Sequence, residues 1–345
     1  MTSDQSSAGA PASKRPPRKY VLLATAVAVV IGGWSAAWFG GRSYLDGEIT
    51  RMMDVAMANG VEVACLERKI GGFPFRFEVS CKDFAFRDPL GGFFSVSDLR
   101  AVALVYNPMH LIVEADSPMA AFRPDSPIQE ASWTSFRASL RYSTAGVTRL
   151  DAVLQEPRFF SSENPTQGEV VMKKAELHLR ADPERPANLD LALSFAGLKT
   201  GDPDHPGTDG AFVGEVAGAA PLLGGTVPLD LFASTQGVPA VTIDSLSLTS
   251  GTSGLSTSGL LKLPSDGFLT GELPLTAIEP GQIRQVLAPL FPVGSPFPEA
   301  LQGALVSFGK PGEKDGRPAI DATLSLAGGT ARIGILPIAQ MQSVY

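Results

Sequence analysis

Residues Phe75 to Lys82 read Phe-Arg-Phe-Glu-Val-Ser-Cys-Lys, so that apolar and polar side chains alternate without a break. Side chains of a β-strand point to opposite faces in turn, and this pattern therefore predicts one buried and one solvated face. The same period of two returns later in the chain. It is found in the runs 136–142, 175–180, 189–195, 243–248 with a phase slip at Asp244-Ser245, and 320–326.

Turn signals separate these runs. They are Asp88-Pro89, Gly91-Gly92, Asn107-Pro108, Gly224-Gly225, Ser265-Asp266-Gly267 and Gly328-Gly329. Many short strands punctuated in this way predict an all-β, mostly antiparallel fold. About 15 or 16 candidate strands are too many for one small sandwich, so the sheet either forms one elongated, curled structure or divides into stacked β-domains. The loop from Asp202 to Gly210, not expected to form a strand, is the candidate boundary between β-rich regions 61–200 and 211–345.

The residues around the first strand suggest how it is held. Gly71 and Gly72 allow a tight turn, and Pro74 would block a ladder hydrogen bond, so we expect the strand to start there. Phe73 and Phe75 are expected to be buried at its head and Phe77 further along it. Arg76 is expected to face outward, as the one charged candidate for a partner contact in this segment.

Cys65 and Cys81 are the whole cysteine complement. Two unpaired, buried thiols are one reading. In an exported chain we favour a disulfide, because such bonds persist in oxidising compartments. On the chain-entropy model, closing a loop of this size stabilises the fold by about 3 kcal/mol. The spacing is not that of a redox-active pair, so a catalytic role is not expected.

Upstream lies an apolar run of 22 uncharged residues between Lys19 and Arg42. A bilayer core needs about 20 such residues in a helix. Basic residues precede the run, and Trp34 and Trp38 lie near its far end, the arrangement of an anchor whose N-terminus stays inside. We therefore predict a disordered cytoplasmic tail over 1–19 and a transmembrane anchor over 20–40. A cleaved signal peptide with a cut near 35–37 is the alternative.

Two helices are expected outside the anchor. In the juxtamembrane region 41–60, residues Glu48 to Asn59 carry one apolar face formed by Ile49, Met52, Met53 and Ala56. This helix is either a stalk or a lid over an apolar groove. The second helix opens at Glu279-Pro280, carries Ile283, Val286, Leu287 and Leu290 on one face, and ends near Pro289. It is expected to plug one end of the β-structure, followed by an apolar loop over 291–298.

Charge and motif searches exclude several function classes. The chain has net charge −7. The first 19 residues carry +3, which leaves −10 for the rest, and this disfavours nucleic acid as a partner. His110, His178 and His205 are not at metal-ligand spacing. Asp202, Asp204 and Asp209 suggest calcium only weakly, because Pro206 interrupts the loop and Val213 replaces the final glutamate of an EF-hand. We predict no catalytic residues, metal or cofactor, and a protein that is not an enzyme.

The run Gly72-Phe73-Pro74-Phe75-Arg76-Phe77, flanked by Cys65 and Cys81, resembles the signature of the bacterial envelope family called domain of unknown function 2125. The anchor, short helix, long β-rich region and ending at 331–337 are also similar to that family. The resemblance implies a bacterial inner-membrane protein with its bulk in the periplasm, and it transfers no catalytic residue. A recurring pattern of glycine and leucine residues at 254–263 and 267–275 is more loosely similar to AsmA-like envelope proteins, which project β-rich grooves thought to conduct lipids.

Two functions fit this sequence. The first is an anchored envelope protein whose β-groove binds a lipid or another hydrophobic small molecule without catalysis. The second is a structural or scaffold protein with dry cores that acts through other envelope proteins. The alternating pattern does not separate them, because a packed core and an open groove share the same period. The family resemblance favours the first.

Overall fold

The computed structural model describes residues 18–89, 91–123, 126–144, 146–161, 169–202, 204–224 and 238–344. Most of the predicted tail lies outside these residues. The described residues begin with the helix α1 (Arg18–Ala58), which is long and apolar enough to cross a membrane. The predicted anchor and juxtamembrane helix are therefore one continuous element. Met52 is exposed rather than packed, while Ile49, Met53 and Ala56 are partly buried.

After α1 the described chain forms one sheet of 20 strands, all of whose pairings are antiparallel. The strands are β1 (Glu62–Ala64), β2 (Glu67–Gly71), β3 (Arg76–Arg87), β4 (Phe93–Leu104), β5 (Asn107–Arg123), β6 (Ser126–Ser132), β7 (Ser135–Ser143), β8 (Gly146–Gln155), β9 (Arg158–Ser161), β10 (Val170–Val171), β11 (Lys174–Ala181), β12 (Leu189–Thr200), β13 (Thr208–Val216), β14 (Ala240–Ser250), β15 (Ser253–Lys262), β16 (Thr270–Ile278), β17 (Lys310–Lys314), β18 (Arg317–Ala327), β19 (Thr330–Ile333) and β20 (Leu336–Gln340). The predicted fold class is confirmed, with more strands than the sequence suggested.

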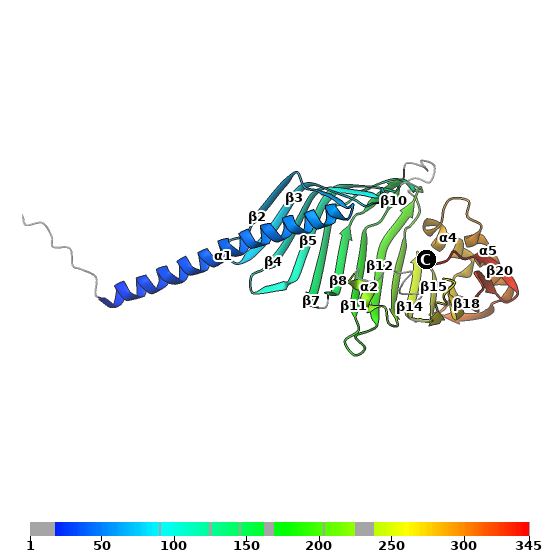
Figure 1. The fold of residues 1–345 in the computed structure, drawn as a ribbon. Coiled ribbons are helices and arrows are strands. Elements are labelled where there is room, and N and C mark those ends of the chain that lie inside the picture. The colour runs from blue at the N-terminus through cyan, green and yellow to red at the C-terminus, as the bar shows by residue number, and fades with distance from the viewer. Residues whose placement is uncertain are drawn as a thin grey trace, which may run out of the picture.

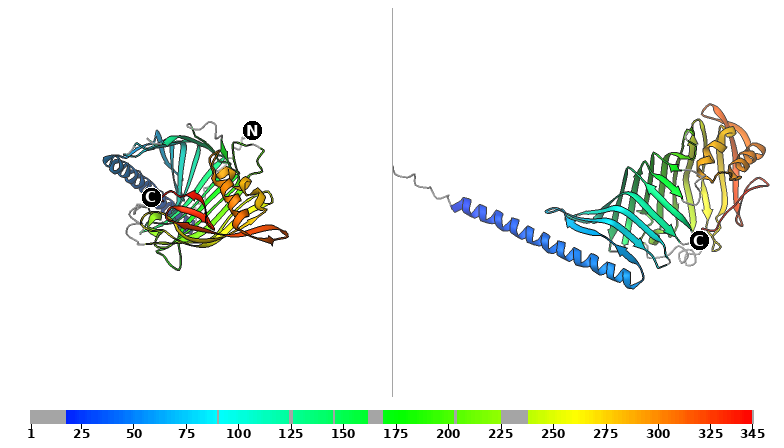
Figure 2. Two further views of the ribbon diagram at one scale, coloured as in Figure 1. Left: turned by 90° about the vertical axis from the view of Figure 1, so that its right-hand side faces the viewer. Right: turned by 90° about the horizontal axis from the view of Figure 1, so that it is seen from above.

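The sheet runs without interruption through the expected domain boundary. Strand β12 pairs directly with β13, and the prediction that no strand forms before Gly210 is wrong, since β13 starts at Thr208. A second correction concerns Asn107, which already belongs to β5, so the turn before it falls at Val105-Tyr106. Figures 1 and 2 show the strands side by side in one elongated sheet that curls into a trough.

The curl follows a line of irregularities that crosses the sheet. Asp83, Glu156 and Gly197 have φ angles of 49°, 49° and 65° there. Strands β6 and β7, β8 and β9, and β10 and β11 are separated by only two residues each, so each pair is one long strand interrupted at this line. Backbone hydrogen bonds such as Glu156 N to Lys173 O keep the sheet joined across it. Bulges of this kind bend strands.

The apolar residues change phase at the same line. Cys81 is followed by Phe84, and Phe195 by Leu198, both odd spacings. Between Phe195 and Leu198 the register against β13 shifts, because a bulge puts an extra residue on one strand and the alternation moves by one position. At Asp83, β3 and β4 change phase together and stay in register. We infer that the bulges return the apolar side chains to one face on both sides of the bend. The phase slip predicted at Asp244-Ser245 is a bulge of this type, confirmed by the register shift between β14 and β15.

The packed core lies at the C-terminal end of the sheet. Two 3-10 turns, η1 (Pro280–Gln282) and η2 (Ala288–Leu290), flank α4 (Ile283–Leu287), and α5 (Phe297–Phe308) follows. Ile283 and Leu287 of α4 and Leu305 of α5 are buried with sheet residues such as Leu275 and Ile320. The predicted plug is confirmed, but Leu290 lies at the surface and the expected loop over 291–298 leads into a helix.

Candidate functional site

One face of the sheet is apolar from end to end, and we call it the apolar face. Residues paired across antiparallel strands share a face, so the register identifies its rows. One row is Phe77, Ala103, Leu111, Leu140, Leu150, Leu179 and Leu191. The next is Val79, Ala101, Val113, Ala138, Ala152, Leu177, Leu193, Phe212 and Leu246. Together they make a continuous apolar surface across nine strands.

Helices cover the apolar face at one end of the molecule and leave it more exposed at the other. From β14 onward, Ile243, Leu275 and Ala277 are less than one-tenth exposed because α4 and α5 pack over them. Before β13, the larger side chains of the same rows are mostly half-buried, and Leu193 is 44% exposed. The four-residue helix α2 (Ala220–Leu223) lies beside β8 and β11 at one rim. The apolar face thus continues from a closed core into a more open trough.

At the other end of the sheet, α1 packs against the first strands. Trp38 is buried there and stacks on Phe77, with ring centroids 5.5 Å apart and planes 16° apart. Its Nε1 donates to Arg76 O at 3.1 Å, and Trp34 Nε1 donates to Pro74 O at 3.0 Å. Further along, Arg68 of β2 pairs with Asp46 at 2.8 Å. The predicted motif is therefore the attachment point of the long helix.

The motif folds differently from the expectation at its start. Strand β3 begins at Arg76, and Phe73 to Phe75 form a turn closed by Arg76 N donating to Gly72 O at 3.1 Å. Phe73 and Phe75 are exposed rather than buried, because the turn lies outside the sheet. Phe73 still contacts α1, stacking on Phe39 at 5.8 Å. Arg76 is exposed as predicted and pairs with Glu78.

The disulfide predicted between Cys65 and Cys81 is present. Cys65 lies between β1 and β2, both of which pair with β3, and Cys81 lies in the middle of β3. The bond therefore fixes the connection between the two edge strands to the strand that carries the motif. The contacts of Trp34 and Trp38 with the motif were missed, since the sequence assigned both rings to the membrane interface alone.

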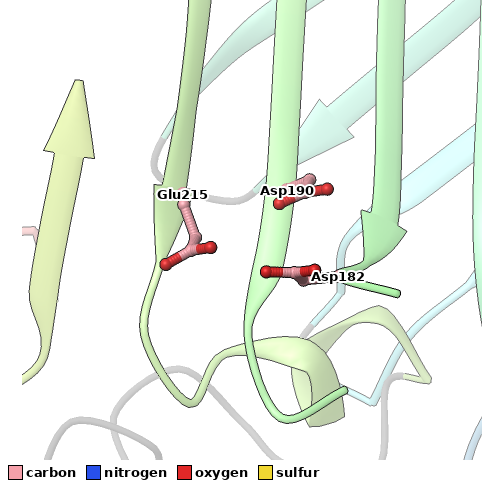
Figure 3. Close-up of side chains that lie close together, drawn as sticks. All are labelled: Asp182, Asp190 and Glu215. Atoms are coloured by element: carbon pink, nitrogen blue, oxygen red, sulfur yellow. The ribbon is translucent and has the colours of Figure 1, made fainter. Parts of the chain in front are cut away.

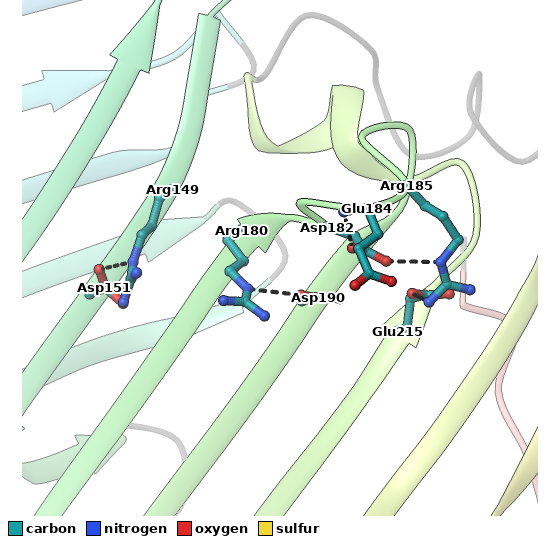
Figure 4. A network of polar contacts seen from close by, with 8 residues as sticks. All are labelled: Arg149, Asp151, Arg180, Asp182, Glu184, Arg185, Asp190 and Glu215. Atoms are coloured by element: carbon teal, nitrogen blue, oxygen red, sulfur yellow. Dashed lines mark hydrogen bonds and ion pairs between the residues drawn. The ribbon is translucent and has the colours of Figure 1, made fainter.

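The opposite, polar face carries a network of charged side chains (Figure 4). Arg149 donates to Asp151 at 2.6 Å, and Arg180 donates to Asp190 at 2.8 Å. The hydrogen bond from Arg149 lowers the pKa of Asp151, and the smaller effect of burial opposes it. His178 also bonds Asp151, at 2.8 Å, so its place on the polar face is confirmed. A hollow of about 530 Å³ lies among these side chains.

Three carboxylates meet in this network (Figure 3). Oxygen atoms of Asp182, Asp190 and Glu215 lie within 4.8 Å of one another, close enough to share a cation. Each already has a partner: Arg180 pairs with Asp190, and Arg185 pairs with both Asp182 and Glu215. Two guanidinium groups therefore offset most of the negative charge. The arrangement is that of a salt-bridge network at the ends of β11, β12 and β13, in which the arginine side chains are exposed and Asp182 is buried.

The remaining residues considered for chemistry have structural contacts. Asp202 accepts from Asp204 N within its own loop, and Asp209 of β13 accepts from Gly197 N at the irregularity in β12. His205 is buried, and its Nε2 lies 2.9 Å from Gln285 O of α4. Thr208 Oγ1 donates to Val286 O at 2.9 Å beside it. These two side chains fasten the connection between β12 and β13 to the plug.

Comparison with known proteins places this fold in a family. Residues 38–342 match the family described as "Uncharacterized protein conserved in bacteria (DUF2125)", and the chain belongs to that family. The match starts at Trp38, the residue of α1 that is buried against the motif. Neither the curated proteins nor the solved structures contain a significant match, so the looser likeness to AsmA-like proteins is not confirmed.

Proposed function

We propose that this protein is anchored in the bacterial inner membrane by α1 and holds a lipid or another hydrophobic ligand along its apolar face, without catalysing a reaction. The observation that carries the proposal is the change of cover along one continuous face. The same rows of leucine, valine and phenylalanine are buried under α4 and α5 at one end and half-exposed before them. Large exposed apolar surfaces in soluble domains mark binding sites for lipids, ligands or partners.

The proposed topology places the N-terminus in the cytoplasm and the sheet in the periplasm. Arg18 and Lys19 precede the apolar stretch of α1, and basic residues favour the cytoplasmic side. The disulfide supports an oxidising compartment for the sheet. The excess of acidic over basic residues in the same part of the chain disfavours nucleic acid as a ligand.

Photo-crosslinking from the two faces tests the proposal. Leu193 on the apolar face and Val213 on the polar face are 44% and 43% exposed and lie on neighbouring strands, β12 and β13. Each is replaced, in the full chain in cells, by the photoreactive residue benzoylphenylalanine. After irradiation, the labelled peptides are weighed by mass spectrometry.

We expect an adduct of lipid mass at position 193 and none at 213. Protein adducts at 193 would instead support a scaffold that acts through other envelope proteins. The absence of adducts at both positions, with the variants folded and oxidised, would overturn ligand binding by the apolar face.

A further inference from the structure

The first inference beyond this function concerns the turn at Gly72–Arg76 and its place relative to the membrane. A span of about 20 residues, at 1.5 Å per residue, crosses the hydrocarbon core of about 30 Å. Counted from Tyr20, it ends at Phe39. The two hydrogen bonds from α1 to the turn come from Trp34 and Trp38, which are therefore in the last part of the span.

Helix α1 is continuous from the span through Trp34 and Trp38. The depth of these two residues in the membrane therefore sets the depth of the turn that is bonded to them. Phe73 is held against the span residues by Trp38 at 5.4 Å and Phe39 at 5.8 Å between ring centroids. A turn bonded to residues 34–39 lies at the level of the membrane–water interface. Tryptophan and tyrosine are enriched at that level because their amphipathic rings sit among the polar headgroups.

The exposed side chains of this corner match the interface. Phe75 is 64% exposed, and its carbonyl accepts from Val105 N at 3.0 Å. That bond places the β4–β5 hairpin, whose Tyr106 is 77% exposed, directly beside the turn. Neither ring has a stacking partner among the described residues. Transfer of the two rings into an apolar phase would remove this apolar surface from water, which is favourable.

We propose that Phe73, Phe75 and Tyr106 enter the outer surface of the bilayer that holds α1 and seat this end of the sheet on it. The occupant of this surface is the lipid bilayer itself. The apolar face, which starts with β3 and β4, then begins at the outer leaflet of the membrane. This part rests on the proposed function: a ligand held on the apolar face would come from that leaflet, since the trough begins there.

Spin labels in the full-length protein, reconstituted in vesicles of phosphatidylethanolamine and phosphatidylglycerol, test this geometry. The two native cysteines are joined, so an added cysteine is the one free thiol. Labels are attached to the variants Phe75→Cys and Tyr106→Cys. The controls are Val27→Cys within the span and Val306→Cys on α5, both exposed in the structure. Collision rates with oxygen, which enriches in lipid, and with a water-soluble nickel complex report the depth.

We expect positions 75 and 106 to collide several-fold more with oxygen than with nickel, position 27 to do so more strongly, and position 306 to show the reverse. If the labels at positions 75 and 106 collide more with nickel, as at position 306, while the label at position 27 lies in lipid, the proposed contact of this corner with the bilayer is wrong. The membrane anchor is then still supported. If 27 also lies in water, the anchor itself fails, and the seating with it. If Phe75→Cys disturbs the turn, the label at position 106, which lies outside the motif, still tests the proposed contact with the bilayer.

Discussion

Gly72 shows how one residue sets the geometry of the helix attachment. Its φ angle is +97°, and a Cβ atom there would lie 2.6 Å from Arg76 O, the backbone that closes the turn. Glycine tolerates such a backbone without steric cost, and other residues do not. The sequence indicated this turn correctly. It misjudged Phe73, because its partners Trp38 and Phe39 lie on a helix more than 30 residues upstream that alternation in a strand does not report. It misjudged Phe75, because that residue lies in a turn before the strand begins.

We expect Gly72→Ala to destabilise the protein by about 1–3 kcal/mol, through backbone strain and the clash with Arg76. Urea unfolding monitored by tryptophan fluorescence measures the loss. Gly71→Ala is the matched control, since nothing lies within 4 Å of a Cβ at that position. Equal losses in the two variants would contradict the role of the turn.

A second residue-scale prediction concerns acid. The folded pKa of Asp151 is lowered chiefly by the hydrogen bond from Arg149. A lowered pKa stabilises the fold above the ordinary aspartate value of about 3.9, and this contribution is lost as the pH falls through the lower folded value. We expect the unfolding free energy of the native protein to fall more steeply below about pH 4 than that of Asp151→Asn. Denaturant titrations from pH 3 to 7 check this, and parallel profiles would contradict it.

Among the elements, α5 carries much of the closed end. The proline-rich run before it reads as loop, yet Pro298 lies in the first turn of the helix, where proline is tolerated because its missing N–H has no helical partner. Beyond that turn, Leu301, Ala304 and Leu305 recur at helical spacing and are buried. A pattern search starting after Pro298 would have found the helix.

We expect Leu305→Ala to cost about 2–5 kcal/mol of unfolding free energy, because Leu305 is fully buried in the core. Val306, its neighbour on the exposed side of α5, is 61% exposed. Val306→Ala should change stability by no more than about 0.5 kcal/mol. Thermal and denaturant unfolding of the two variants measure the difference. A similar loss in both would indicate that α5 is not packed as described.

At the scale of the whole molecule, the sequence predicted an antiparallel sheet and could not distinguish one trough from two domains. The period of two is identical for a face under helices and for a face left open. The line of bulges that curls the sheet was visible only as phase changes, such as Cys81 to Phe84, and only the slip at Asp244-Ser245 was noticed. Which strands meet across the bend depends on long-range pairing, which local patterns do not encode.

The whole-molecule prediction is that one charge on the apolar face reduces bound lipid, while the same charge on the polar face does not. Leu193→Asp should lower the lipid that co-purifies with the full chain several-fold, because a carboxylate desolvates poorly beside acyl chains. Val213→Asp, of equal exposure on the polar face, should leave it unchanged. Lipid extraction and quantitative mass spectrometry give the ratio. Equal lipid content in both variants would contradict binding along the apolar face.

The attachment of α1 also determines where the polypeptide can be shortened. A soluble form that begins after Phe39 would lack both indole donors, leaving Pro74 O and Arg76 O without those bonds and the Phe77 ring uncovered. Such a fragment should aggregate through its first strands. A form that begins at Trp34 keeps these contacts and the whole of the helix beyond the span, and is the better starting point for crystals and for calorimetry.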